Sequence, residues 1–184
     1  MDRETVLVGI DAGTTKVTTL IGEVSRGGDV NIIGYGIAPS VGMKKGMVAN
    51  IDQTVNSIAA SLEKAERLSG YKISSAFVSV GGSHISSQNS RGVVAVSGHK
   101  REVSREDVAR ATEAAKAIQV PSNREILHVI PRGYIVDGQE GIKDPLGMSA
   151  VRLEVETHIV AGAATSIQNL SKCCLLYTSP SPRD

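Results

Sequence analysis

The stretch VLVGIDAGTTK, residues Val6–Lys16, decides how this chain folds. Its first five residues are apolar or glycine, a pattern that predicts a strand buried on both faces. The apolar run ends at Asp11, and a second strand-like run follows at Val17–Val24. We therefore predict a β-hairpin whose tight turn holds a carboxylate, a glycine, two hydroxyls and an ammonium group.

The groups in this turn suit a phosphate ligand. Gly13 permits a positive φ and a close approach of a ligand to the backbone, and successive backbone N–H groups form a concave anion site. Thr14 and Thr15 add hydroxyl donors, Lys16 adds a positive charge, and Asp11 is placed to hold a hydrated Mg²⁺. The alternative is a hairpin in which these side chains only satisfy the backbone of the turn.

Composition narrows the class of protein. The chain has 184 residues, a net charge of +1, one Phe and no Trp. This charge gives no long-range attraction to nucleic acid, and the few aromatic residues offer no platform for stacking bases. The adjacent Cys173 and Cys174 suit neither a disulfide framework nor a zinc site. The N-terminal residues lack the features of a secretory signal, and no apolar run is long enough to span a membrane, so we expect a cytoplasmic location.

The rest of the first 82 residues predicts a small α/β unit. A third strand is expected at Val30–Ala38, an amphipathic helix at Val48–Ser69 with Gly70 just beyond it, and a fourth strand at Ser74–Val80. The loop Pro39–Lys45 ends in a lysine pair, which we interpret as a solvated loop tip. The predicted order is therefore β-β-β-α-β.

Residues 83–162 predict a separate small α+β unit. The run of residues 83–91 is polar and turn-rich, and a capping box of Ser104 and Asp107 opens a helix. The expected elements are a strand at Gly92–Ser97, the helix to Gln119, a strand at Glu125–Val136 with an edge or bulge at Pro131, a loop at Asp137–Met148 and a strand at Val151–Val160.

The hairpin resembles the first phosphate-binding hairpin of the superfamily that contains actin, DnaK-type chaperones and sugar kinases. It does not match the Walker A or Rossmann glycine patterns. Four further segments are more specific, and over about Thr5–Cys173 the chain resembles the FtsA family of bacterial cell-division proteins. These segments are GGSHISSQNSRG (Gly81–Gly92), SREDVARA (Ser104–Ala111), Arg124–Val160, which contains DGQEGIKDPLGMSAVRLE, and QNLSKC (Gln168–Cys173).

The resemblance implies the first part of a ribonuclease-H-like actin subdomain, called 1A, at residues 1–82. It implies an inserted subdomain of the SHS2 type, called 1C, at 83–162, and a return to 1A at 163–173. Residues 174–184 contain Pro180 and Pro182 where the family continues a helix, so we expect a disordered, non-native tail there. The second half of the nucleotide site is then expected beyond residue 184.

The resemblance also implies a function. FtsA-like proteins bind Mg·ATP, self-associate like actin, tether FtsZ to the cytoplasmic face of the inner membrane at the division site and help recruit later division proteins. Asp11 is then expected near the Mg²⁺, and Gly13, Thr14, Thr15 and Lys16 at the phosphates. The membrane contact is made by a C-terminal helix that this sequence lacks. Hydrolysis is expected to be weak at best, and no catalytic base can be chosen.

The loop Asp137–Met148 is expected to serve partners of the protein as well as its own packing. It interleaves three apolar residues, Ile142, Leu146 and Met148, with turn-forming residues that do not need them. The alternatives to the FtsA function are a sugar kinase, a chaperone or a pilus-assembly protein on the same fold, or a module that acts only through its insert.

Overall fold

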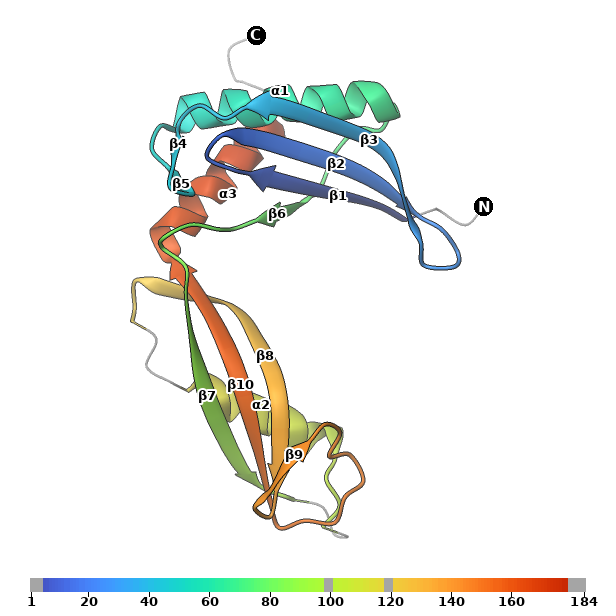
Figure 1. Cartoon of the computed structure of the whole chain (residues 1–184), viewed down its shortest axis with the longest axis vertical. Coiled ribbons are helices and arrows are strands. Elements are labelled where there is room, and N and C mark those ends of the chain that lie inside the picture. The colour runs from blue at the N-terminus through green and yellow to red at the C-terminus, as the bar shows by residue number, and fades with distance from the viewer. Residues whose placement is uncertain (1–4, 98–100, 118–120, 179–184) are drawn as a thin grey trace. The chain divides into compact units, whose positions relative to one another are not determined.

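The computed structural model describes residues 5–97, 101–117 and 121–178. The chain folds as two compact units (Figure 1). The first unit comprises Met1–His84 together with Thr165–Asp184, and the second comprises Ile85–Ala164.

The first unit is built on a four-stranded sheet of order β3-β2-β1-β6. Strands β1 (Thr5–Ala12), β2 (Lys16–Val24) and β3 (Val30–Pro39) are antiparallel neighbours, as predicted. Strand β6 (Phe77–Ser79) pairs with β1 in the parallel direction. Because β6 lies beside the end of β1, residues far apart in the sequence meet next to Asp11.

Helix α1 (Ile51–Ser69) covers one face of this sheet (Figure 1). Asn50 caps its start, since Asn50 Oδ1 accepts from the Gln53 N–H at 3.0 Å, and the expected Gly70 ends it in the left-handed conformation. The helix starts at Ile51, three residues later than predicted, because the residues before it form another strand.

The contact between α1 and β3 is very close. A Cβ atom at Gly36 would lie 1.9 Å from the Ser61 carbonyl oxygen, so only glycine fits. Ser61 Oγ donates to the Gly36 carbonyl at 3.0 Å and lies 2.8 Å from Thr19 Oγ1. These buried hydrogen bonds fix the helix against β3 and β2, because an unpaired polar group there would be costly.

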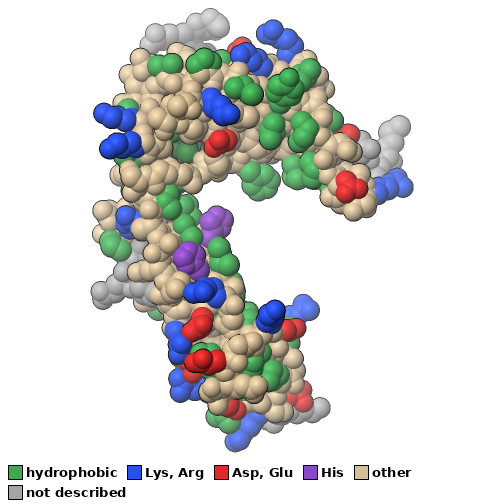
Figure 2. Space-filling view, in the orientation of Figure 1, with side chains coloured by type: hydrophobic (Ala, Val, Ile, Leu, Met, Phe, Trp, Pro, Cys, Tyr) green, Lys and Arg blue, Asp and Glu red, His purple; other side chains and the backbone are tan. Residues whose placement is uncertain are grey.

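The prediction that β1 is buried on both faces was wrong. Val8, Ile10 and Ala12 are buried, but the alternate residues of β1 are exposed. Helix α1 and residues 173–174 pack against the first of these faces. The opposite face shows hydrophobic side chains at the surface (Figure 2), and its large members are Leu7, Leu20, Tyr35, Ile37 and Phe77, which are 38–74% exposed.

A short hairpin that the sequence did not indicate precedes α1. Strands β4 (Met43–Lys44) and β5 (Met47–Val48) pair around a turn at Lys45–Gly46. The region had been interpreted as a loop because each strand has only two residues, too few to show an alternating pattern.

Helix α3 (Ala164–Thr178) belongs to the first unit. Cys173 is fully buried in the core beside Ile10, Ile58 and Leu62. The expectation that regular structure ends at residue 173 was wrong for residues 174–178, which continue the helix up to the prolines. Residues 179–184 of the expected tail lie outside the described residues.

The second unit contains an antiparallel sheet of order β7-β10-β8-β9. Its strands are β7 (Ser86–Ala95), β8 (Arg124–Val136), β9 (Gln139–Ile142) and β10 (Arg152–Ala163). The predicted bulge at Pro131 is confirmed, because Thr157 pairs with Pro131 while Glu156 pairs with Gly133.

Two predictions for this unit were wrong. The polar residues from Ser86 to Arg91 were interpreted as turn-rich but form the first part of β7, where they pair with β10. The long loop after β8 contains β9. Polar and glycine-rich sequence conceals both strands, because pairing with a neighbouring strand stabilises them more than their own β-propensity does.

Helix α2 (Arg105–Lys116) packs on this sheet and begins with the predicted capping box. The Asp107 N–H donates to Ser104 Oγ at 3.2 Å, and the Ser104 N–H donates to Asp107 Oδ2 at 3.0 Å. Ser97 and Arg110 also donate to Asp107, which is fully buried. The helix was expected to reach Gln119, which lies outside the described residues.

These hydrogen bonds predict a pH-dependent contribution to stability. The hydrogen bonds from Ser104 have the largest effect on the pKa of Asp107, followed by those from Arg110 and Ser97. Together they hold the pKa of Asp107 in the folded protein far below its usual range. A carboxyl group of the unfolded chain has a pKa of about 4. The ionised Asp107 therefore contributes its full stabilisation above about pH 4, and this contribution declines as the pH falls below that value. Asp107→Asn should lower the unfolding free energy by about 2 kcal/mol near neutral pH.

Urea unfolding at several pH values, followed by NMR signals of the second unit, measures this effect. The difference between the native protein and the variant should shrink towards about pH 3. Asp144→Asn is a suitable control, because Asp144 is exposed and its carboxylate accepts from the Leu146 N–H at 3.1 Å. A difference that stays constant down to acid pH would contradict the assignment.

Candidate phosphate-binding site

The turn between β1 and β2 is closed by its own backbone. The Gly13 N–H donates to the Lys16 carbonyl oxygen at 3.0 Å. A Cβ atom at Gly13 would lie 2.9 Å from that same oxygen, so glycine is required for the close approach. The expected positive φ at Gly13 was wrong. The glycine is explained by the narrowness of the turn.

Asp11 lies at the end of β1 with its side chain exposed. It pairs with Thr18 of β2 on one side and with Ser79 of β6 on the other. Ser79 Oγ donates to Asp11 Oδ1 at 2.5 Å. One carboxylate oxygen is thus held by the neighbouring strand, which orients the side chain at the end of the sheet.

Asp11 opens onto a depression of about 500 Å³ in the first unit. Four segments form its wall: the end of β1 with its turn, the β4–β5 turn, the end of β6 and the glycines that follow β6. The lining residues are Asp11, Ala12, Gly13, Thr14, Lys45, Gly46, Ser79, Val80, Gly81, Gly82 and Ser83. Asp11 is the only acidic residue among them. Small residues and backbone dominate the wall, which leaves room for a ligand to approach peptide groups closely.

The β4–β5 turn is held against the hairpin by one polar contact. The Gly46 N–H donates to Thr14 Oγ1 at 3.2 Å, although the two residues lie 32 positions apart. The turn also touches the segment after β6, because a Cβ atom at Gly46 would lie 2.3 Å from the Gly81 carbonyl oxygen. The three segments therefore form one continuous backbone surface.

The structure brings together only some of the predicted phosphate ligands. Asp11, Gly13 and Thr14 line the depression, whereas Thr15 and Lys16 are not among its lining residues. The Thr15 carbonyl accepts from the Ser40 N–H at 3.0 Å, which ties that residue to the end of β3.

Sequence reasoning missed several residues of the site, namely Lys45, Gly46, Ser79, Gly81 and Gly82. Two short patterns were available as signals: a Lys-Lys-Gly turn at residues 44–46 and two successive glycines at residues 81–82, after a strand. Neither pattern is specific by itself, and nothing in the sequence shows that they meet.

The three apolar residues proposed for partner contacts lie in the second unit and differ in their surroundings. Ile142 and Met148 pack against the core of that unit. Leu146 is 42% exposed. The loop is therefore anchored by two of these side chains and presents the third to solvent.

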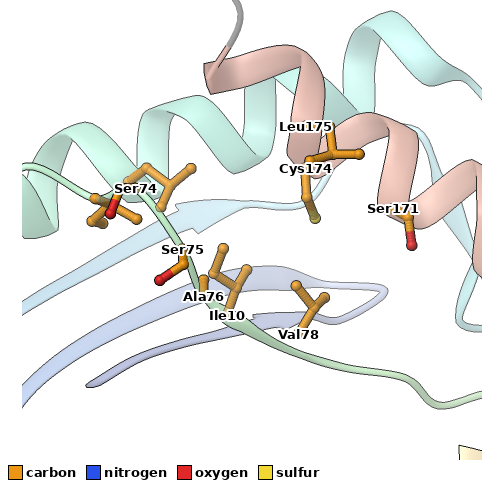
Figure 3. A pocket seen from close by; sticks show the side chains of 10 residues that line it. Ile10, Ser74, Ser75, Ala76, Val78, Ser171, Cys174 and Leu175 are labelled. Atoms are coloured by element: carbon orange, nitrogen blue, oxygen red, sulfur yellow. The ribbon is translucent and has the colours of Figure 1, made fainter. Parts of the chain in front are cut away.

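A second hollow, of about 290 Å³, is mainly apolar (Figure 3). Ile10, Ala76 and Val78 lie on its sheet side, and Cys174 and Leu175 of α3 lie on the other side. No charged side chain lines it. Burial raises the pKa of the Cys174 thiol to about 11, so the thiol is protonated at neutral pH and weakly nucleophilic.

The chemistry of the depression suits a phosphate and a hydrated Mg²⁺. Mg²⁺ keeps several waters and needs only one or two carboxylates besides phosphate oxygens. Asp11 supplies one such carboxylate next to the hydroxyls of Thr14 and Ser79. The described residues contain no cluster of three or more His, Cys, Asp or Glu side chains able to hold a metal by themselves.

Comparison with known proteins then shows which proteins the chain is similar to. Residues 82–161 match the family model described as "SHS2 domain inserted in FTSA". The cell division protein FtsA of Pseudomonas aeruginosa is 45% identical over 168 residues, and that of Borreliella burgdorferi is 48% identical over 168 residues. Over most of its length the chain is similar to the first part of FtsA proteins. Each of these two alignments covers 91% of this chain.

The similarity to FtsA extends well beyond the inserted domain. FtsA of Bacillus subtilis is 42% identical over 173 residues, which cover 94% of this chain and 39% of that protein. The alignments with the other two relatives cover 40% and 41% of their lengths. The chain thus spans about two fifths of the FtsA proteins that it matches.

A solved structure supports the predicted fold class. The PilM-PilN type IV pilus biogenesis complex contains a chain that matches with a TM-score of 0.59 and 12% identity, over 93% of this chain and 44% of that chain. At this identity the likeness shows the fold alone. The predicted actin-like α/β fold with an inserted SHS2 domain is confirmed. Within the described residues, no helix has the length and apolar character needed to cross a membrane.

The backbone contact at the β4–β5 turn gives a testable prediction. Gly46→Ala should lower the unfolding free energy by more than about 2 kcal/mol, because it combines a positive φ with a clash against backbone. Gly28→Ala is the matched control: Gly28 also has a positive φ, but a Cβ there has nothing within 4 Å. It should cost about 1 kcal/mol. Urea unfolding of both variants measures the difference, and equal losses would show that the contact is unimportant.

Proposed function

We propose that this chain carries the first phosphate-binding half, and the SHS2 domain, of an actin-like cell-division adaptor that binds Mg·ATP. The observation that carries the proposal is the depression in which Asp11, Gly13 and Thr14 meet two glycine-rich segments. Its dimensions, hydroxyl donors and single carboxylate suit the phosphate end of a nucleotide, and the similarity to FtsA proteins supports the same assignment.

Each group in the site has a defined task under this proposal. Thr14 Oγ1 accepts from the Gly46 N–H, so its own hydrogen is available for a phosphate oxygen. Ser79 holds one oxygen of Asp11, and the other oxygen faces the waters of a bound Mg²⁺. Mg²⁺ supplies charge neutralisation for the phosphates when bound. Thr15 and Lys16 remain proposed phosphate contacts from the resemblance, at the edge of the turn.

The activities of the whole protein are also proposed. We infer that the protein self-associates, links FtsZ to the cytoplasmic face of the inner membrane and helps recruit later division proteins. We further propose that FtsA proteins contact FtsZ, the membrane and adenosine through regions other than the two fifths of their length that this chain matches. Nucleotide acts mainly as a ligand for assembly, and hydrolysis is weak.

Titration of the chain with Mg·ATP, followed by amide NMR shifts, tests the proposed site. We expect the shifts to concentrate at Thr14, Gly46, Gly81 and Gly82. The affinity should be weak, because the chain spans only about two fifths of the FtsA proteins that it matches. AMP, with a single phosphate, should cause smaller shifts at the same residues. If Mg·ATP moves none of these signals, the assignment of the site is wrong. Micromolar affinity by calorimetry would contradict the proposed half-site.

The loop Asp137–Met148 of the SHS2 domain gives a second test. Leu146→Glu should change the unfolding free energy by less than about 0.5 kcal/mol, whereas Met148→Glu should cost about 2 kcal/mol or more because it buries a charge. If Leu146 contacts a division protein, a full-length protein carrying Leu146→Glu should accumulate normally and yet fail to support septation. Leu146→Met is the control that keeps an apolar surface. Normal septation with Leu146→Glu would remove Leu146 from the partner surface.

A further inference from the structure

Two lysines compete for the role of the phosphate-binding cation. Lys16 is the one that the sequence favours, because it directly follows Thr14 and Thr15. The structure places Lys45, from the β4–β5 turn, among the residues that line the depression, together with Asp11, Gly13 and Thr14. Lys16 is not among those residues, and it begins β2 with an exposed side chain.

The backbone at Lys45 is unusual for a lysine. Lys45 has a φ of 52° and Gly46 a φ of 77° in the two-residue turn between β4 and β5. Two successive positive φ values are typical of a hairpin turn that prefers Asn-Gly or Asp-Gly. A lysine at the first position costs stability, and such strained residues concentrate at functional sites.

The turn has little freedom to relieve this strain. The Gly46 N–H is bonded to Thr14 Oγ1 at 3.2 Å. A Cβ atom at Gly82 would lie 2.5 Å from the Lys45 carbonyl oxygen, so the two backbones are in direct contact. Lys45 therefore stays at the rim of the depression, and the four-carbon stem of its side chain gives the ammonium group a wide reach.

The charges around Lys45 favour an anionic ligand. Among the described residues, no carboxylate forms an ion pair with Lys45. Asp11 is the acidic residue of the lining, and the Ser79 hydroxyl holds one of its oxygens. Lys44, the preceding residue, is not among the lining residues, so it serves as a comparison for a lysine on the same hairpin.

We propose that Lys45, more than Lys16, is the cation that binds the terminal phosphates of a di- or triphosphate at this site. The inference rests on the proposed function and adds a ligand from a different segment. It also explains the hydrogen bond between the Gly46 N–H and Thr14 Oγ1. This hydrogen bond holds the β4–β5 turn next to the β1–β2 turn, so Lys45 and the hydroxyl of Thr14 approach the same anion.

The test uses the whole chain and inorganic triphosphate with Mg²⁺, which removes any contribution from the nucleoside. Affinity is measured from the amide shifts of Gly81 and Gly82 in the native protein and in Lys45→Gln, Lys16→Gln and Lys44→Gln. Lys45→Gln should weaken binding about fivefold, and the other two variants less than about twofold. Lys45→Arg should restore most of the affinity, because it keeps the charge.

A second variant separates binding from folding. Asparagine suits the backbone conformation of Lys45 better than lysine does. Lys45→Asn should therefore raise the midpoint of thermal unfolding while it weakens triphosphate binding about as much as Lys45→Gln does. If Lys45 only occupies the turn and does not contact the ligand, Lys45→Asn would raise stability without weakening triphosphate binding. That result would overturn the inference.

The outcomes distinguish this inference from the function on which it rests. If triphosphate and Mg·ATP leave the native spectrum unchanged, both fail. If the native protein binds triphosphate and Lys16→Gln alone weakens binding, the proposed site stands and the role of Lys45 is refuted. An equal loss in all three glutamine variants would indicate general electrostatic attraction and would also overturn the inference.

Discussion

The candidate site depends on a contact between two stretches of backbone. At Gly46 and Gly82 the chain meets itself so closely that a single Cβ atom at either position would overlap a main-chain atom. This contact joins the turn before α1 to the segment after β6, and the bond from Gly46 to Thr14 adds the hairpin. A surface made of peptide groups results. Such a surface is fixed in place before a ligand arrives, which lowers the entropic cost of binding.

Close contacts between a glycine and the backbone also set the distance between helix and sheet in each unit. In the first unit α1 lies directly on Gly36 of β3, and in the second unit a Cβ atom at Gly92 of β7 would lie 2.0 Å from the Ala111 carbonyl oxygen in α2. Small residues on both sides let the layers approach, so polar groups such as Ser61 reach partners across the interface. Close packing of this kind makes the position of a strand end, and hence of Asp11, well defined.

The sequence predicted what short-range chemistry determines. The hairpin, the Gly70 cap and the capping box at Ser104 each depend on residues a few positions apart, and all are present. The role of Lys45 could not be predicted, because it depends on a contact with Gly82, 37 positions away. Likewise, a continuous apolar run such as β1 does not reveal whether one or both faces are covered in a given chain, since that depends on elements elsewhere.

The exposed face of the first sheet bears on the chemistry of Asp11. Leu20 and Phe77, which are exposed, line a hollow of about 400 Å³ that also contains Asp11 and Ser79. Any segment that covers this apolar face removes water from the surroundings of the Asp11 carboxylate. A buried carboxylate is costly unless a cation or further hydrogen bonds compensate for the lost water. Covering of the face and binding of a cation at Asp11 are therefore energetically coupled, and each makes the other more favourable.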